Sequence, residues 1–210
     1  ISEDIQNTDT ISDSIAYLTE VYEGGGSDEN IAVIDMSKFS NGGTFGKGLQ
    51  GEIVELKNLD CTGVTSLKFL MSGYANVTKV SLINTSSVTS FQATFADATS
   101  LVEVNEFDTS NTTTVQTMFG ACSSLVTIPV FNLVKVPSSW QNFVNNCPNL
   151  SNTSLQNVLK SLLTSVNQGS SASNAKKLSF IGLSETQANI CITFPEWTTL
   201  STEYGWVTGY

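Results

Sequence analysis

Four acidic residues lie close together in the sequence: Asp97, Glu103, Glu106 and Asp108. Two carboxyl groups can cleave a glycosidic bond without another catalytic side chain, because one serves as the acid and the other as the base or nucleophile. The cluster therefore leaves open a carboxylate-based enzyme that acts on glycans. Against this, Asp108 and Glu103 each occupy a repeated position, described below, at which a structural role is expected.

The composition argues against most other kinds of catalysis. All nine basic residues of the 210-residue chain are lysines, and there is no histidine. Histidine is the usual base of nucleophilic triads and a common zinc ligand, and arginine supplies the fork that grips phosphate. The net charge of −10 repels nucleic acid. We therefore expect no enzyme activity, no cofactor, no metal and no nucleic-acid partner.

Two other motifs carry little chemistry. The four cysteines form no CxxC pair, which argues against a metal or thioredoxin-like site. Residues 40–51 are rich in glycine and contain Lys47, but they lack the Gly-Lys-Ser/Thr order of a phosphate-binding loop. No stretch is long and apolar enough to span a bilayer, so we expect no membrane insertion.

A constant offset of 24 in the numbering superimposes apolar residues on apolar residues along much of the chain, with apolar positions often three apart. The main sets are Ile53/Val77/Leu101/Leu125, Leu56/Val80/Val104/Ile128, Leu59/Ile83/Phe107/Phe131/Leu155 and Met71/Phe95/Phe119/Phe143. Such a period predicts a solenoid, in which each coil sends apolar side chains inward and stacking neighbours close the core.

Two polar columns repeat with the same period. Glu55, Lys79, Glu103 and Thr127 would become neighbours on a parallel sheet, and the first three alternate in charge sign. We take these four residues as the candidate binding ladder.

The second column contains Asp60, Asn84, Asp108 and Asn132, whose side chains can bond their own backbone in a turn. A calcium site using Asp60 and Asp108 is disfavoured, because two coils would separate them by roughly 10 Å.

The segment FDTSNTTTVQTMFGACSSLVTIPVF, residues 107–131, resembles the BspA-like surface leucine-rich-repeat family of Treponema type. That family's pattern is Phe-x-x-Cys-x-x-Leu-x-x-Ile, and the resemblance covers about residues 53–155. It implies a right-handed leucine-rich-repeat stack with short parallel strands, used for binding and without catalysis. It also makes the cysteine column a core position, so we expect buried free thiols. A disulfide between Cys122 and Cys147, which occupy matching positions of neighbouring coils, is the alternative.

The ends of the chain complete an α/β repeat solenoid with three parts. Residues 1–26 are predicted to be an acidic helix and glycine hinge, in which Ile11, Ile15, Leu18 and Tyr22 form an apolar stripe. This helix either docks on the body or joins copies of the chain through residues 1–22. Residues 27–155 form the solenoid with a cap strand at 30–36.

Residues 156–210 are predicted to form a C-terminal α/β cap. A helix begins near Asn152, a short strand covers 176–183, and Ser184 and Gln187 form a capping box. Trp197, Trp206 and Tyr210 are interpreted as an aromatic plug in the cap core, with a sugar-stacking platform as the alternative.

These features favour a non-catalytic recognition or adhesion module on an outer surface, with a host cell-surface protein or glycan as its partner. Because the ending EYGWVTGY is similar to that of phage and prophage repeat proteins, we favour a phage fibre or decoration protein. A bacterial cell-surface adhesin, a purely structural virion component and, least favoured, a glycan-active enzyme remain as alternatives.

Overall fold

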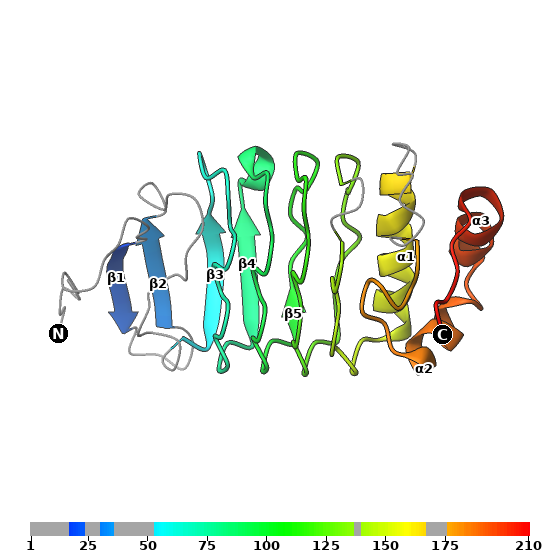
Figure 1. Ribbon diagram of the computed structural model, residues 1–210. Coiled ribbons are helices and arrows are strands. Elements are labelled where there is room, and N and C mark those ends of the chain that lie inside the picture. Colours follow the sequence, from blue (N-terminus) through cyan, green and yellow to red (C-terminus); the bar gives the residue numbers. More distant parts are fainter. Residues whose placement is uncertain (1–16, 24–29, 36–52, 137–139, 167–175) are drawn as a thin grey trace.

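The computed structural model describes residues 17–23, 30–35, 53–136, 140–166 and 176–210. Within these residues, successive turns of the chain lie side by side in one row, between a two-stranded hairpin and three α-helices (Figure 1). Backbone groups one period apart are joined directly: the Thr78 N–H donates to the Val54 carbonyl, and the Val102 N–H donates to the Thr78 carbonyl. We call each such turn of the chain a coil.

The N-terminal hairpin corrects one prediction. Strand β1 (Tyr17–Glu23) pairs antiparallel with β2 (Asn30–Asp35). The cap strand expected at 30–36 is thus confirmed, whereas the helix expected through residue 22 is wrong for residues 17–23. Aromatic and β-branched residues in YLTEVYE favour a strand, and β2 supplies the backbone partners that an isolated helix would not need. Ile11, Ile15 and the three glycines at 24–26 lie outside the described residues.

A parallel sheet follows, in the order β3 (Glu55–Asp60), β4 (Lys79–Ile83) and β5 (Glu103–Val104). The register pairs Leu56 with Val80 and Val80 with Val104, which confirms that predicted core column.

In a neighbouring column, Leu59, Phe107, Phe131 and Leu155 are buried as predicted, but Ile83 is not. Leu59 pairs with Leu82, not with Ile83, and Ile83 is 38% exposed. The register shifts because β3 contains one residue more than β4 between the paired positions, and Asn58 takes a left-handed conformation there with φ 52°.

After its strand, each coil continues into turns that are hydrogen-bonded to the next coil. We call these turns the return segment, and the side of the molecule that they form the return side. The Phe95 N–H donates to the Met118 carbonyl, and the Phe119 N–H donates to the Phe143 carbonyl, both at 2.9 Å. Two residues of each return segment have positive φ: one at the repeated positions Phe69, Ala93, Thr117 and Asn142, and one four residues later, at Gly73, Asp97, Ala121 and Asn146. This recurring pair of left-handed residues gives the return segments the same bends in each of these coils.

The strand predicted at 176–183 is instead one more return segment. The Asn142 N–H donates to the Phe180 carbonyl at 2.9 Å, and the Val144 N–H donates to the Ile181 carbonyl at 3.1 Å. The prediction failed because Gly182, with φ 92°, bends the chain where a strand would continue. A Cβ at Gly182 would lie 2.5 Å from the Asn145 Cα, so the backbones of these two return segments approach closely.

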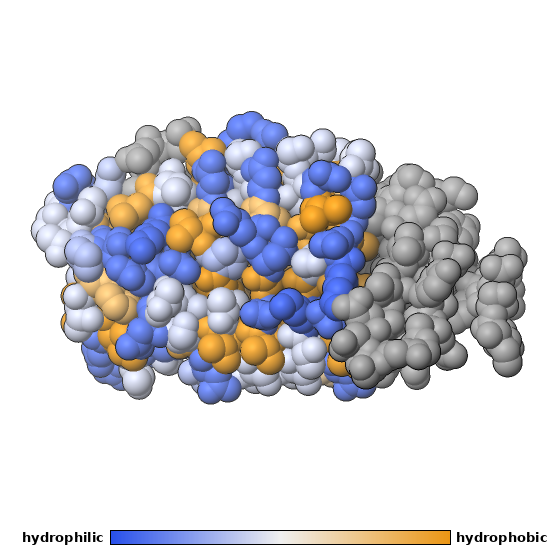
Figure 2. All heavy atoms as spheres, turned by 180° about the vertical axis from the view of Figure 1, so that it is seen from behind, coloured by the Kyte–Doolittle hydropathy of each residue, from blue (hydrophilic) through white to orange (hydrophobic). Residues whose placement is uncertain are grey.

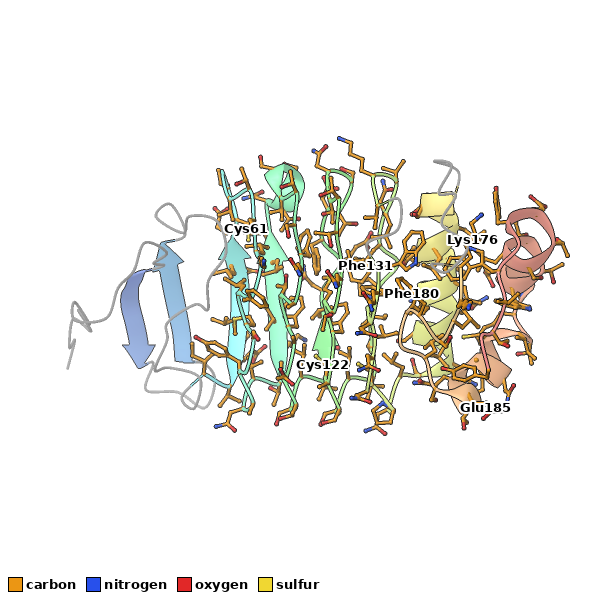
Figure 3. All side chains as sticks on the ribbon, viewed as in Figure 1. Cys61, Cys122, Phe131, Lys176, Phe180 and Glu185 are labelled. Atoms are coloured by element: carbon orange, nitrogen blue, oxygen red, sulfur yellow. The ribbon has the colours of Figure 1, made fainter. Side chains whose placement is uncertain are left out.

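The inside of the coils is packed with apolar side chains (Figure 3). Phe95 and Phe119, at equivalent positions of adjacent coils, are fully buried and stack with their ring centroids 5.3 Å apart and their planes 7° apart. Phe143 continues the same column, with its ring centroid 5.6 Å from that of Phe119. The predicted aromatic column is therefore confirmed for these three residues.

Helix α1 (Asn152–Val166) closes the C-terminal end of the row of coils, and the predicted boundary at residue 155 falls inside it. Its predicted apolar stripe is confirmed: Leu155, Val158, Leu159 and Leu162 are buried and Leu163 is partly buried.

A second stripe on α1, of polar residues, was not predicted. Ser161 Oγ accepts from the Phe131 N–H at 2.8 Å, and the Asn157 side chain donates to the Ile128 carbonyl at 2.9 Å. Ser154 accepts from the Ile128 N–H in the same way. The helix thus satisfies backbone groups that the last coil would otherwise leave unpaired.

The cap ends with α2 (Glu185–Cys191) and α3 (Pro195–Tyr204). Ser184 and Gln187 form the predicted capping box. Trp206 is buried against Trp140, with ring centroids 5.8 Å apart. Tyr210, however, is 59% exposed, so its assignment to an aromatic plug is wrong. Trp206 already fills the space beside Trp140, and Tyr210 lies beyond the last backbone bond of the tail, which Thr208 accepts.

Candidate recognition surface

The four predicted ladder residues lie next to one another on the sheet. The register pairs Glu55 with Lys79 and Lys79 with Glu103, and an isolated bridge pairs Glu103 with Thr127. The Lys79 ammonium forms an ion pair with Glu103, and both side chains are about half exposed. The hydrogen bond from Lys79 to Glu103 raises the pKa of Lys79, and the charge of Glu103 adds to the effect. This column is therefore a row of opposite charges on the outer face of the sheet.

An exposed apolar column runs beside the charged one. Val54, Val102 and Val126 are 56%, 41% and 38% exposed, and Thr78 occupies the repeated position between the first two valines. Backbone bonds hold the four residues in line, including one of 2.9 Å from the Val126 N–H to the Val102 carbonyl. We call the charged and apolar columns together the strand face. Sequence reasoning missed the valines, although their regular spacing is visible.

The predicted turn role is confirmed for Asp60, Asp108 and Asn132, whereas the Asn84 side chain bonds to Asp60 of the neighbouring coil. Asp60 Oδ1 accepts from the backbone N–H and the hydroxyl of Thr62 at 2.9 and 2.7 Å, and from the Asn84 side chain at 3.0 Å. Bonds from the Thr62 side chain, the Asn84 side chain and the Thr62 backbone lower the pKa of Asp60. Asp108 accepts from the Ser110 N–H at 2.8 Å, which likewise lowers its pKa.

The acidic cluster of the sequence divides among different positions. Glu103 lies on β5 and pairs with Lys79, whereas the Asp97 N–H bonds to the Gly120 carbonyl on the return side. Glu106 and Asp108 both line one depression near the ends of β4 and β5. Among the described residues, no group of three or more Asp, Glu, Cys or His is placed to hold a metal ion.

That depression has a volume of about 380 Å³ and was not predicted from the sequence. It is open to solvent and lies between two neighbouring coils. Its lining comes from two short segments: Leu82, Ile83, Asn84, Thr85 and Ser86, and Asn105, Glu106, Phe107 and Asp108. We call it the turn depression.

The four cysteines are free and buried. Cys122 Sγ contacts the Phe95 carbonyl oxygen at 3.0 Å, and Cys147 Sγ contacts that of Phe119 at 2.9 Å, so both thiols lie at equivalent places in adjacent coils. Burial raises the pKa of Cys61, Cys147 and Cys191 to about 12, and it raises that of Cys122 as well. These thiols therefore stay protonated at neutral pH and act as small core side chains.

The face of the molecule seen from behind carries hydrophilic side chains with smaller apolar areas among them (Figure 2). The return side of the coils also carries a ladder of glutamines. Gln92 donates to Gln116 at 3.3 Å and Gln116 donates to Gln141 at 3.4 Å. No helix in the described part of the chain is both long and apolar enough to cross a bilayer.

The family described as Mycoplasma protein of unknown function, DUF285, matches residues 35–158. The match covers more than half of the chain, so the protein belongs to this family. The matched region extends from the end of β2 through the sheet and the coils into α1. No curated protein and no solved structure matches the chain.

Proposed function

We propose that this protein is a non-catalytic recognition module built as a right-handed, leucine-rich-repeat-like solenoid of the BspA type. Membership of the DUF285 family and the regular backbone ladder between coils support this proposal. The observation that carries it is the strand face, on which four coils present equivalent exposed side chains in line. Stacked repeats of this kind form long, stiff surfaces that suit the binding of extended targets.

The strand face supports a partner on a host cell surface, either a protein or a glycan. It joins half-exposed charges, Lys79 and Glu103, to the exposed side chains of Val54, Val102 and Val126. Protein interfaces commonly combine an apolar centre with polar groups at the rim. An interface here would bury the valines and use the charges to select the partner and its orientation.

The proposed setting is extracellular, on a virion or a bacterial cell. The phage-fibre setting stays a prediction from the ending of the chain, and assembly through residues 1–22 falls mainly outside the described residues. The family description names the bacterium Mycoplasma, and a bacterial cell-surface adhesin is the alternative setting. A purely structural virion component is the other alternative, and the binding experiment separates it from a recognition role.

The test is binding of the intact chain to bacterial cells and to animal-cell envelope fractions. Changing Lys79→Glu places three carboxylates in adjacent coils, and Val102→Asp adds a charge to the apolar column. We expect either change to weaken binding about tenfold or more while the unfolding midpoint stays near that of the wild type.

The matched control is Lys68→Glu, which makes the same charge change on the return side of the coil that contains β3. It should bind as the wild type does. Equal losses in Lys68→Glu and Lys79→Glu would mean that net charge, and not the strand face, controls binding. Absence of binding to every cell type and fraction would favour the purely structural role.

A further inference from the structure

We propose that the turn depression is a binding site for a neutral saccharide. This proposal rests on the function proposed above, but it assigns the ligand to a place away from the strand-face columns. The depression lies between the coil that contains β4 and the coil that contains β5. Its lining combines hydrogen-bond acceptors with one exposed aliphatic side chain.

The depression exists because the sheet ends early at this point. Strand β5 stops at Val104, and the Asn105 side chain then takes the place of a backbone partner for Leu82. The Leu82 N–H donates to Asn105 Oδ1 at 2.8 Å, and Asn105 Nδ2 donates to the Leu82 carbonyl at 2.9 Å. The Asn105 side chain therefore joins the two coils at a point where a continued sheet would use backbone-to-backbone hydrogen bonds.

The equivalent place between the coil of β3 and the coil of β4 is bonded differently. There, the Cys61 N–H bonds directly to the Ile83 carbonyl at 3.0 Å, and Asn84 bonds to Asp60. The Asn105 bonds to Leu82 therefore have no counterpart at this place in the preceding pair of coils. Its floor is formed by buried groups, and Thr85 Oγ1 fixes it by donating to the Asp108 carbonyl at 2.8 Å.

The rim offers hydrogen-bond acceptors that the described residues leave available. The Glu106 carboxylate has no bond within the described part of the chain. In the same part of the chain, the Asp108 carboxylate accepts from Ser110 alone, and Asn84 donates to Asp60 but keeps its side-chain carbonyl available. These groups accept hydrogen bonds, so they suit a ligand that donates several, such as the hydroxyl groups of a sugar.

The charge, the apolar contact and the volume of the depression indicate which classes of ligand it can bind. The rim carries the carboxylates of Asp108 and Glu106, and this negative charge repels acidic ligands. Ile83 is 38% exposed beside these groups and offers an apolar contact for the carbon–hydrogen face of a sugar ring. A volume of about 380 Å³ lies at the lower end of ligand-pocket sizes and suits one or two sugar rings.

The experiment uses the intact chain on an array of neutral, amino-bearing and acidic oligosaccharides, followed by titration of the best neutral binder. Two variants probe the site: Glu106→Ala removes an acceptor without breaking an internal bond, and Ile83→Ser removes the apolar contact. We expect affinity for a neutral saccharide to fall about tenfold in each variant. The controls are Glu203→Ala on α3 and Val130→Ser, whose side chain is 40% exposed.

Each outcome decides the proposal. A neutral saccharide that binds the wild type and both controls, but binds the two site variants weakly, supports it. Equal binding by all variants, or binding of only acidic or only amino-bearing sugars, overturns it. If the chain binds cells but no saccharide, the saccharide site is wrong and the recognition function stands; if it binds neither, both proposals fail.

Discussion

Asn105 forms hydrogen bonds with both backbone groups of Leu82, which lies one coil earlier in the stack. The same side chain also donates to the Glu106 carbonyl at 2.7 Å. A single amide therefore ends the parallel sheet, satisfies a buried residue of the preceding strand and sets the position of the segment that follows. It is the point at which strand pairing gives way to the turn depression.

Replacing Asn105 by alanine should destabilise the protein by about 1–3 kcal/mol, because the Leu82 N–H and carbonyl lose their partners. Urea unfolding followed by circular dichroism measures the change. The matched control is Asn149→Ala, which removes a single exposed bond to the Ser123 carbonyl and should cost less. Equal losses in the two variants would show that the Asn105 bridge has no special role.

Phe119→Ala should destabilise the chain by about 3–5 kcal/mol, because its fully buried ring stacks on Phe95 and packs against Phe143 on the other side. The measurement is the free energy of unfolding in guanidinium chloride. Phe69→Ala serves as the control, since Phe69 is 40% exposed and should cost about 1 kcal/mol or less. A small loss in Phe119→Ala would contradict the tightly packed aromatic column.

Ser161→Ala on α1 should cost about 1–3 kcal/mol, because it leaves the buried Phe131 N–H without an acceptor. Thr153→Ala, at an exposed position of the same helix, separates this effect from any change in helix propensity. Hydrogen exchange gives a second readout: the Phe131 amide should exchange faster in Ser161→Ala alone. Unchanged exchange would mean that α1 does not satisfy the edge of the last coil.

The turn carboxylate Asp60 should make stability depend on acid pH. Because its pKa is lower in the folded chain than in the unfolded one, its contribution is present above the usual carboxyl pKa of about 4 and disappears as pH falls through the folded value. The difference in stability between wild type and Asp60→Asn should therefore shrink from pH 7 toward pH 3. Glu203→Gln controls for net charge, and a difference that does not change with pH would contradict the prediction.

The cysteines should be unreactive in the folded protein, because all four are buried and protonated at neutral pH. A colorimetric thiol assay at pH 8 should detect almost none of them in the native state and all four after unfolding in urea. Rapid reaction of Cys122 or Cys147 in the native state would mean that the coils open easily. Fewer than four reactive thiols in urea without reductant would indicate a disulfide.

Several parts of the candidate site could be predicted from the sequence because they depend on repeated positions. Lys79 and Glu103 were placed together from their spacing alone, and Asp60 was assigned to a turn from its residue type and position. The turn depression could not be predicted, because it depends on the bonds that the Asn105 side chain forms with the preceding coil. An asparagine at position 105 is visible in the sequence, but its partner in the preceding coil is not.

The sequence by itself determined the repeating core columns, the apolar stripe of α1, the capping box at Ser184 and the apolar setting of the thiols. Each of these features follows from residue types at a fixed spacing along the chain, so it can be predicted without knowing the tertiary contacts. Only the tertiary structure decided that Ile83 faces outward and that residues 17–23 pair as a strand. It also decided that the serines of α1 complete the last coil. The physical reason is that hydrogen bonds between distant segments outweigh local preference, and a shift of one residue in register changes which side chains are buried.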